Sequence, residues 1–236
     1  MYTHRLADRC VKDPEWVSEF LKYVDENPNS CQEVWLCSAY GFPSVEKHRE
    51  IALSMKPTVD MFRARKIRVA LQISNTKGGH AGIKYSDNSG LIHDGWHAPF
   101  CVDDEGNDVE YTFCTASKDF RKYLSEVIEA YLSELDVCGV WIDDDFRMGN
   151  HTQVCWCDDC ISEFSKRVGK EYTRQELVTL VNSDLGVRDE WIEFTAFRYY
   201  DAAKFIADSV HRVKPDVYTA LQHGANGYMA GAGHKD

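Results

Sequence analysis

The stretch "VCGVWIDDD" (residues 137–145) is an apolar run that ends in three consecutive aspartates. A short run of apolar and aromatic residues bounded by polar residues is typical of a buried β-strand. Parallel α/β proteins place their functional sites at the carboxyl ends of the strands. The stretch therefore predicts a parallel α/β fold whose site includes the aspartates.

Similar runs recur along the chain and alternate with amphipathic helical patterns. The predicted strands cover residues 33–41, 67–75, 110–114, 137–145 and 217–224, and the predicted helices cover residues 13–27, 44–66, 117–135, 161–169, 173–181 and 189–213. Asp13 before Pro14 gives the first helix a clear start, and Pro57 is expected to break or kink the second. No hairpin signal separates the strands, so we expect crossover helices and a parallel sheet.

Five predicted strands are fewer than the eight of a closed (β/α)8 barrel, which takes about 250 residues. We therefore predict that residues 1–236 form a single domain, the N-terminal portion of a (β/α) TIM barrel with about five β/α units. Residues 76–109 are rich in Gly, Asp and His and are predicted to form a long functional loop.

The composition argues against several classes of protein. The net charge is −11 without a dense Lys/Arg cluster, which disfavours nucleic acid as a partner. No apolar run approaches the roughly 20 residues that cross a bilayer, and the N-terminus lacks the apolar segment of a secretion signal. Nine cysteines, an odd number, argue against a disulfide framework and favour reduced thiols in a cytoplasmic protein. Homo-oligomerisation is left open.

The loop "HTQVCWCDDC" (residues 151–160) holds the cysteines Cys155, Cys157 and Cys160 among polar neighbours. Three thiolates this close repel one another unless a cation neutralises them, and Zn²⁺ prefers four tetrahedral sulfur or nitrogen ligands. Cys114, after the short third strand, is the favoured fourth ligand, and His151 is the alternative. Free thiols and an iron–sulfur cluster are the competing interpretations. Five other cysteines in apolar or helical contexts are interpreted as small buried hydrophobes: Cys10, Cys31, Cys37, Cys101 and Cys138.

The three aspartates are the candidate catalytic groups. Side chains alternate along a strand, so Asp143 and Asp145 point away from Asp144. One carboxyl at the barrel mouth would act as a general acid/base, its pKa raised by the neighbouring like charges. The competing interpretation is a solvated strand end or a helix cap. Residues near the strand ends and in the long loop are candidate substrate contacts: Tyr40, Asn75, Trp96, Arg147 and His223.

Two segments carry a resemblance to a known family. "VWIDDDFRMGNHTQVCWCDDCISEF" (residues 140–164), preceded by "FCTASKDFRKYLSEVIEAYL" (residues 113–132), resembles the catalytic core of the family 42 β-galactosidases and their relatives in the large (β/α)8 glycoside hydrolase clan. The resemblance is loose over residues 30–225 and close over residues 112–165. It implies hydrolysis of a β-galactoside or related sugar by the full-length protein.

In that family the fourth strand ends in Asn-Glu, the Glu being the acid/base, and a C-x-C-x₂-C loop binds a structural zinc. Matched by position, Asp145 corresponds to the acid/base and Asp144 to the Asn. The resemblance also implies that Cys114 completes the zinc site of the loop cysteines.

The chain departs from the family pattern in two ways. Asp replaces the catalytic Glu, and the substrate-holding Arg expected before the third-strand cysteine has no counterpart in "EGNDVEYTF". The family nucleophile follows strand seven, which implies that this chain alone is inactive. Two functions follow as hypotheses, a glycoside hydrolase with a structural zinc, or a non-catalytic carbohydrate-binding or degenerate barrel module.

Overall fold

The computed structural model describes residues 2–7, 11–74, 76–78, 91–93, 96–97, 99–143, 146 and 155–222, the side chain of Tyr111 excepted. Within this part of the chain, five parallel strands form one sheet in the order β1 (Thr3–Leu6), β2 (Glu33–Cys37), β3 (Arg68–Ile73), β6 (Gly139–Ile142) and β7 (Tyr218–Leu221). The strand order never reverses, as in the wall of a (β/α) barrel and unlike a doubly wound sheet. The sheet is not closed, because β1 and β7 are its two edges.

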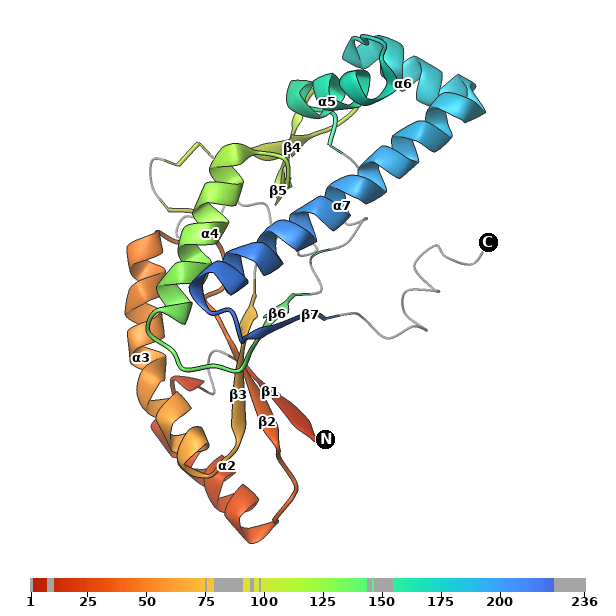
Figure 1. Cartoon of the computed structure of the whole chain (residues 1–236). Coiled ribbons are helices and arrows are strands. Elements are labelled where there is room, and N and C mark those ends of the chain that lie inside the picture. Colours follow the sequence, from red (N-terminus) through yellow and green to blue (C-terminus); the bar gives the residue numbers. More distant parts are fainter. Residues whose placement is uncertain are drawn as a thin grey trace.

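Helices connect the strands; four of them lie against one face of the sheet, and two pack on the first half of the longest helix. The helices are α2 (Pro14–Glu26), α3 (Val45–Ala64), α4 (Lys118–Leu132), α5 (Asp158–Val168), α6 (Arg174–Ser183) and α7 (Leu185–Val213). In Figure 1, α2, α3 and α4 lie on the same side of the strands, and the second half of α7 packs beside α4. Among the described residues, no helix combines the length and apolar character that crossing a bilayer requires.

The two faces of the sheet differ in chemistry. The face toward the helices carries apolar side chains such as Val34, Leu36 and Leu71, which are fully buried in the main core. The strand register places Glu33, Trp35, Arg68, Gln72, Trp141 and Tyr218 on the opposite face. This polar and aromatic face corresponds to the interior of a barrel, and we call it the inner face.

The helix starts follow from local sequence. The Asp13 carboxylate accepts hydrogen bonds from the backbone N–H groups of Glu15 and Trp16 at the start of α2. The expected break at Pro57 is wrong, since α3 continues through it. Buried residues on both sides of Pro57, Met55 and Val59, hold the helix against the core and offset the lost backbone hydrogen bond.

The predicted third strand is the main correction to the sequence-based fold. Residues 110–114 do not join the parallel sheet; β5 (Asp108–Phe113) pairs antiparallel with β4 (Phe100–Val102) in a hairpin. The Asp103 carboxylate accepts hydrogen bonds from three backbone N–H groups of the turn, and Gly106 has a φ of +100°. The sheet still has five strands because β1, a half-exposed edge strand absent from the prediction, replaces it.

Candidate metal centre

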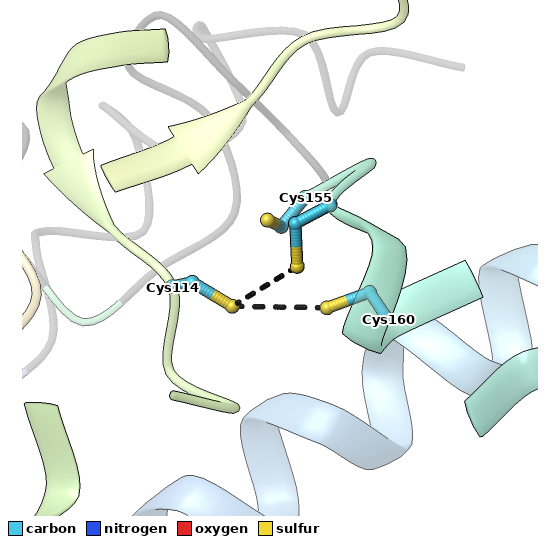
Figure 2. Close-up of side chains that lie close together, drawn as sticks. Cys114, Cys155 and Cys160 are labelled. Atoms are coloured by element: carbon cyan, nitrogen blue, oxygen red, sulfur yellow. Dashed lines mark hydrogen bonds between the residues drawn. The ribbon is translucent and has the colours of Figure 1, made fainter. Parts of the chain in front are cut away.

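Four cysteines from two separate segments of the chain bring their sulfur atoms together. The Sγ of Cys114 lies 3.8 Å from that of Cys157 and 3.7 Å from that of Cys160. With Cys155 included, all four sulfur atoms lie within 4.8 Å of one another. Figure 2 shows Cys114, Cys155 and Cys160 pointing toward a common centre. The cysteine set predicted from the sequence is therefore assembled in the fold.

The sulfur spacing fits a single four-coordinate ion. A disulfide requires an S–S distance of about 2.05 Å, and none of the eight cysteines in the described ranges forms one. Four sulfurs at about 2.3 Å from a tetrahedral ion stand about 3.8 Å apart, close to the two distances observed here. In an iron–sulfur cluster the four thiolates are divided among two or four iron atoms, so ligands on different irons stand further apart. The residues present therefore fit one soft divalent ion.

The β4–β5 hairpin delivers Cys114. The cysteine follows β5 directly, and its backbone N–H donates to the carbonyl of Pro99 at 2.9 Å, which fixes it beside the start of β4. It reaches the loop cysteines through this hairpin, and not through neighbouring parallel strands as the sequence suggested. The position of Cys114 thus depends on a turn about ten residues upstream.

The start of α5 delivers the other three thiols. Cys157 is the N-cap of α5 and Cys160 lies one turn further along. Cys155 is tied to the hairpin, because the backbone N–H of Val102 donates to its Sγ at 3.4 Å and Trp156 N–H donates to the Val102 carbonyl at 2.8 Å. The C-x-C-x₂-C spacing therefore brings together the thiols of a loop residue, of the helix N-cap and of a residue in the first turn of the helix.

The thiols share their protons unequally. Hydrogen bonds from Cys114, Cys155 and Cys160 lower the pKa of the Cys157 thiol, and the N-terminus of α5 favours the same negative charge. Hydrogen bonds with Cys114 and the other two thiols raise the pKa of Cys160. Cys157 is thus the sulfur that most readily carries the first negative charge for an incoming cation.

The end of β6 carries the one candidate acid that the structure describes. Asp143 is 2% exposed on the inner face, accepts a hydrogen bond from Gln72 Nε2 and lies 3.8 Å from the Arg5 guanidinium. Arg5 Nε also donates to Gln72 Oε1 at 2.6 Å. Arg5 is not predictable as a site residue, since an arginine in a short edge strand gives no signal in the sequence. The other candidates Asp144 and Asp145 lie outside the described residues.

The predicted substrate contacts are dispersed. Tyr40 is exposed after β2. Trp96 is half-buried, stacks on His93 and Phe113, and lines a groove of about 720 Å³ between the starts of α3 and α4. Neither Asp143 nor the cysteines line that groove. Three substrate candidates and the alternative metal ligand lie outside the described residues: Asn75, Arg147, His223 and His151.

A small cavity of about 30 Å³ adjoins the cysteines and contains residues that the sequence analysis missed. Lys77, Arg198 and Tyr199 line it together with three of the four thiols, and Cys101 is a further buried thiol in its wall. Cys101 is buried, as predicted, but it packs against the metal-ligand candidates. Basic residues this distant in sequence carry no signal of their place in the site.

Comparison with solved structures identifies the fold. The glycoside hydrolase domain of PgaB (BpsB) from Bordetella bronchiseptica is similar with a TM-score of 0.60 and 10% identity, over 93% of this chain and 64% of that chain. A β-galactosidase from Bacillus circulans sp. alkalophilus is similar with a TM-score of 0.59 and 15% identity, over 94% of this chain and 36% of that chain. This chain thus spans less than two thirds of each. No protein-family model and no curated protein matches the sequence.

Proposed function

We propose that the chain is the N-terminal portion of a (β/α)8 glycoside hydrolase domain that cleaves a β-galactoside or related O-glycoside by carboxylate acid/base catalysis. The observation that carries the proposal is the joining of Cys114 to the loop after β6. The candidate acids precede this loop in the sequence, and the cysteine cluster holds the far end of the loop. The fold of the chain is similar to that of two glycoside hydrolase structures. Further β/α units would close the barrel, in a protein that keeps its thiols reduced in the cytoplasm.

We assign the role of proton donor to Asp145, with Asp144 as the alternative. Asp143 is the least suitable of the three, because its carboxylate already accepts a hydrogen bond from Gln72 and faces Arg5. A carboxylate already engaged by two neighbouring side chains is less available to a substrate. Asp143 instead suits a fixed negative charge in the inner face that orients Gln72.

We assign the metal as Zn²⁺ in a structural role. Four cysteine ligands fill the tetrahedral coordination of the ion, so no position remains for water or substrate. The residues Cys114, Cys155, Cys157 and Cys160 would hold it, and its contribution is to fix the β4–β5 hairpin against the start of α5.

A non-catalytic carbohydrate-binding or degenerate barrel module is the second candidate. The pairing of Asp143 with Gln72 and Arg5 favours it, because the only strand-end acid in the described ranges is already engaged. Such a module would keep the metal centre and the fold but not hydrolyse sugars.

Assays of the natural full-length protein distinguish the two candidates. On a panel of nitrophenyl glycosides, we expect hydrolysis of a β-galactoside or a related substrate. We expect Asp145→Asn to lower kcat/KM by about 10²–10⁴-fold, the usual contribution of a general acid, and Asp143→Asn as the matched control to lower it less. Unchanged hydrolysis by Asp145→Asn would refute the acid assignment. Sugar binding without hydrolysis would establish the second candidate.

A further inference from the structure

The cavity beside the cysteines has one sulfur-rich wall and one basic wall. Cys114, Cys155 and Cys160 form the first, and the buried side chains of Lys77 and Arg198 belong to the second. Its volume of about 30 Å³ leaves room for one or two water molecules, so the two walls are close neighbours.

Arg198 is the unusual member of this wall. Its side chain is 10% exposed, and its Nε has no hydrogen-bond partner among the residues that the structure describes. Its NH1 is 2.7 Å from the Glu163 carboxylate on α5 and 4.0 Å from Asp201 one turn along α7. Leaving a buried guanidinium donor without a partner costs free energy. A negative charge near Arg198, besides those of Glu163 and Asp201, would offset that cost.

The metal centre supplies such a charge. Four thiolates around one divalent cation carry a net charge of −2, and Cys114 and Cys160 are buried, where an uncompensated charge is expensive. Lys77 in the same wall donates from Nζ to the hydroxyl of Tyr199, which also lines the cavity, at 2.5 Å. The wall thus holds two cationic side chains, of which Arg198 shares its charge with Glu163.

We propose that Arg198 is a counter-ion of the metal centre, a positioning residue that lowers the cost of gathering four thiolates in the core. The inference rests on the proposed metal centre and adds a residue to it. Glu163 competes with the thiolates for the guanidinium, because it is the nearer partner of Arg198 NH1. The affinity of the four thiolates for the metal then depends on the charge of Arg198 as well as on the positions of the sulfur atoms.

Zinc affinity of the full chain, measured by competition with a chromophoric chelator, tests this assignment. We expect Arg198→Met to weaken zinc binding about 10- to 100-fold, the usual effect of removing an outer-shell partner of a metal ligand, and Arg198→Lys to weaken it less. Arg188→Met, the same change elsewhere on α7 where Nε donates to the Val181 carbonyl, is the matched control and is expected to bind as the wild type does.

Glu163→Gln separates a counter-ion from a simple brace between α5 and α7. A counter-ion freed of its competing carboxylate binds the thiolates better, so zinc affinity should stay the same or rise. If Arg198 only braces the helices, Glu163→Gln should weaken zinc binding as Arg198→Met does. Circular dichroism of each metal-free variant confirms that the fold is retained.

Three outcomes would overturn the assignment. Zinc binding by Arg198→Met equal to that of Arg188→Met would remove Arg198 from the centre while leaving the metal site intact. Equal weakening by Glu163→Gln and Arg198→Met would make Arg198 a brace. A wild-type chain that binds no metal would refute the metal centre itself, and the counter-ion with it.

Discussion

His48 shows how one residue fixes the loop after β2. Its Nδ1 lies 3.2 Å from the Tyr131 hydroxyl and its Nε2 3.0 Å from the Tyr123 hydroxyl. Tyr123 donates to the Pro43 carbonyl, and Tyr131 accepts from the Ala39 backbone N–H. Because the Tyr123 hydroxyl proton is donated to Pro43, His48 Nε2 must carry the histidine proton and donate it to the Tyr123 oxygen. His48 Nδ1 then accepts a hydrogen bond from the Tyr131 hydroxyl. The network ties the loop after β2 to α4.

This histidine predicts a specific pH dependence of stability. Burial, with a smaller effect of the His93 charge, lowers the pKa of His48 from 6.5 to about 4. Because the folded pKa lies below the unfolded one, the full stability is present above pH 6.5 and is lost as the pH falls toward 4. The loss attributable to His48 is about 3 kcal/mol, from the size of the shift.

Urea unfolding of wild type and His48→Gln between pH 7.5 and 4 measures this effect. We expect the variant to be less stable at pH 7.5 and to show a flatter pH dependence than wild type between pH 6.5 and 4. His211→Gln, which replaces an exposed histidine, is the control. Parallel pH profiles for wild type and His48→Gln would contradict the prediction.

Cys114 is the one candidate metal ligand in the described residues that comes from outside the C-x-C-x₂-C loop. We expect the wild type to bind about one zinc per chain, and Cys114→Ser to bind it at least about 100-fold more weakly, because a serine hydroxyl is a poor zinc ligand. Metal analysis after dialysis measures this, with Cys138→Ser, a half-buried thiol outside the cluster, as the control. Equal zinc content in the three proteins would contradict it.

At the scale of elements, the pairing of β6 with β7 depends on a missing side chain. Gly139 lies opposite Tyr218, and a Cβ at Gly139 would meet the tyrosine ring. The Tyr218 hydroxyl donates to Glu33 Oε1 at 2.7 Å and accepts from Trp141 Nε1 at 3.1 Å. The glycine therefore lets the ring cross the inner face and complete a hydrogen-bonded set from three strands.

We expect Gly139→Ala to destabilise the fold by about 1–3 kcal/mol, the usual cost of overpacking a filled core. Gly186→Ala, near the start of α7, is the matched control because its added Cβ meets only the flexible end of the Asp184 side chain. Urea denaturation gives the two changes in the free energy of unfolding. A Gly139→Ala protein as stable as Gly186→Ala would show that the ring can move aside at no cost.

The elements also show where local sequence reading succeeds and where it fails. The run at 137–145 and the helices with clear caps were predicted because their signals are local. Residues 110–113 do form a strand, as predicted. The predicted partner was a strand of the parallel sheet, whereas the observed partner is β4. The apolar residues of this segment fit either a sheet or a hairpin, and only the turn at Asp103 and Gly106 decides between them.

At the scale of the whole molecule, the four cysteines lie between parts whose buried apolar side chains form separate clusters. The main core fills the space between the sheet and α2, α3, α4 and α7, while a second cluster packs α5 and α6 on the first half of α7. The cysteines lie in a third cluster, between the hairpin and α5. An ion held there would stabilise the junction by binding only the folded state.

Removal of the metal should therefore lower the Tm. At free zinc one hundred times the Kd, bound metal contributes about 2.7 kcal/mol, which a strong chelator would abolish. Calorimetry with and without chelator measures the shift, and Cys114→Ser is the control that should not respond. A wild-type Tm that is unchanged by chelator would contradict a structural role for the metal.

The sequence by itself determined the alternation of strands and helices, the strand that ends in aspartates, and the four cysteines of the candidate metal centre. These rest on hydrophobic periodicity and on ligand spacing along one or two segments. The tertiary structure decided that a hairpin carries Cys114, that Arg5 and Gln72 engage Asp143, and that Arg198 faces the thiols. Contacts between residues tens of positions apart depend on packing, and packing leaves no periodic trace in the sequence.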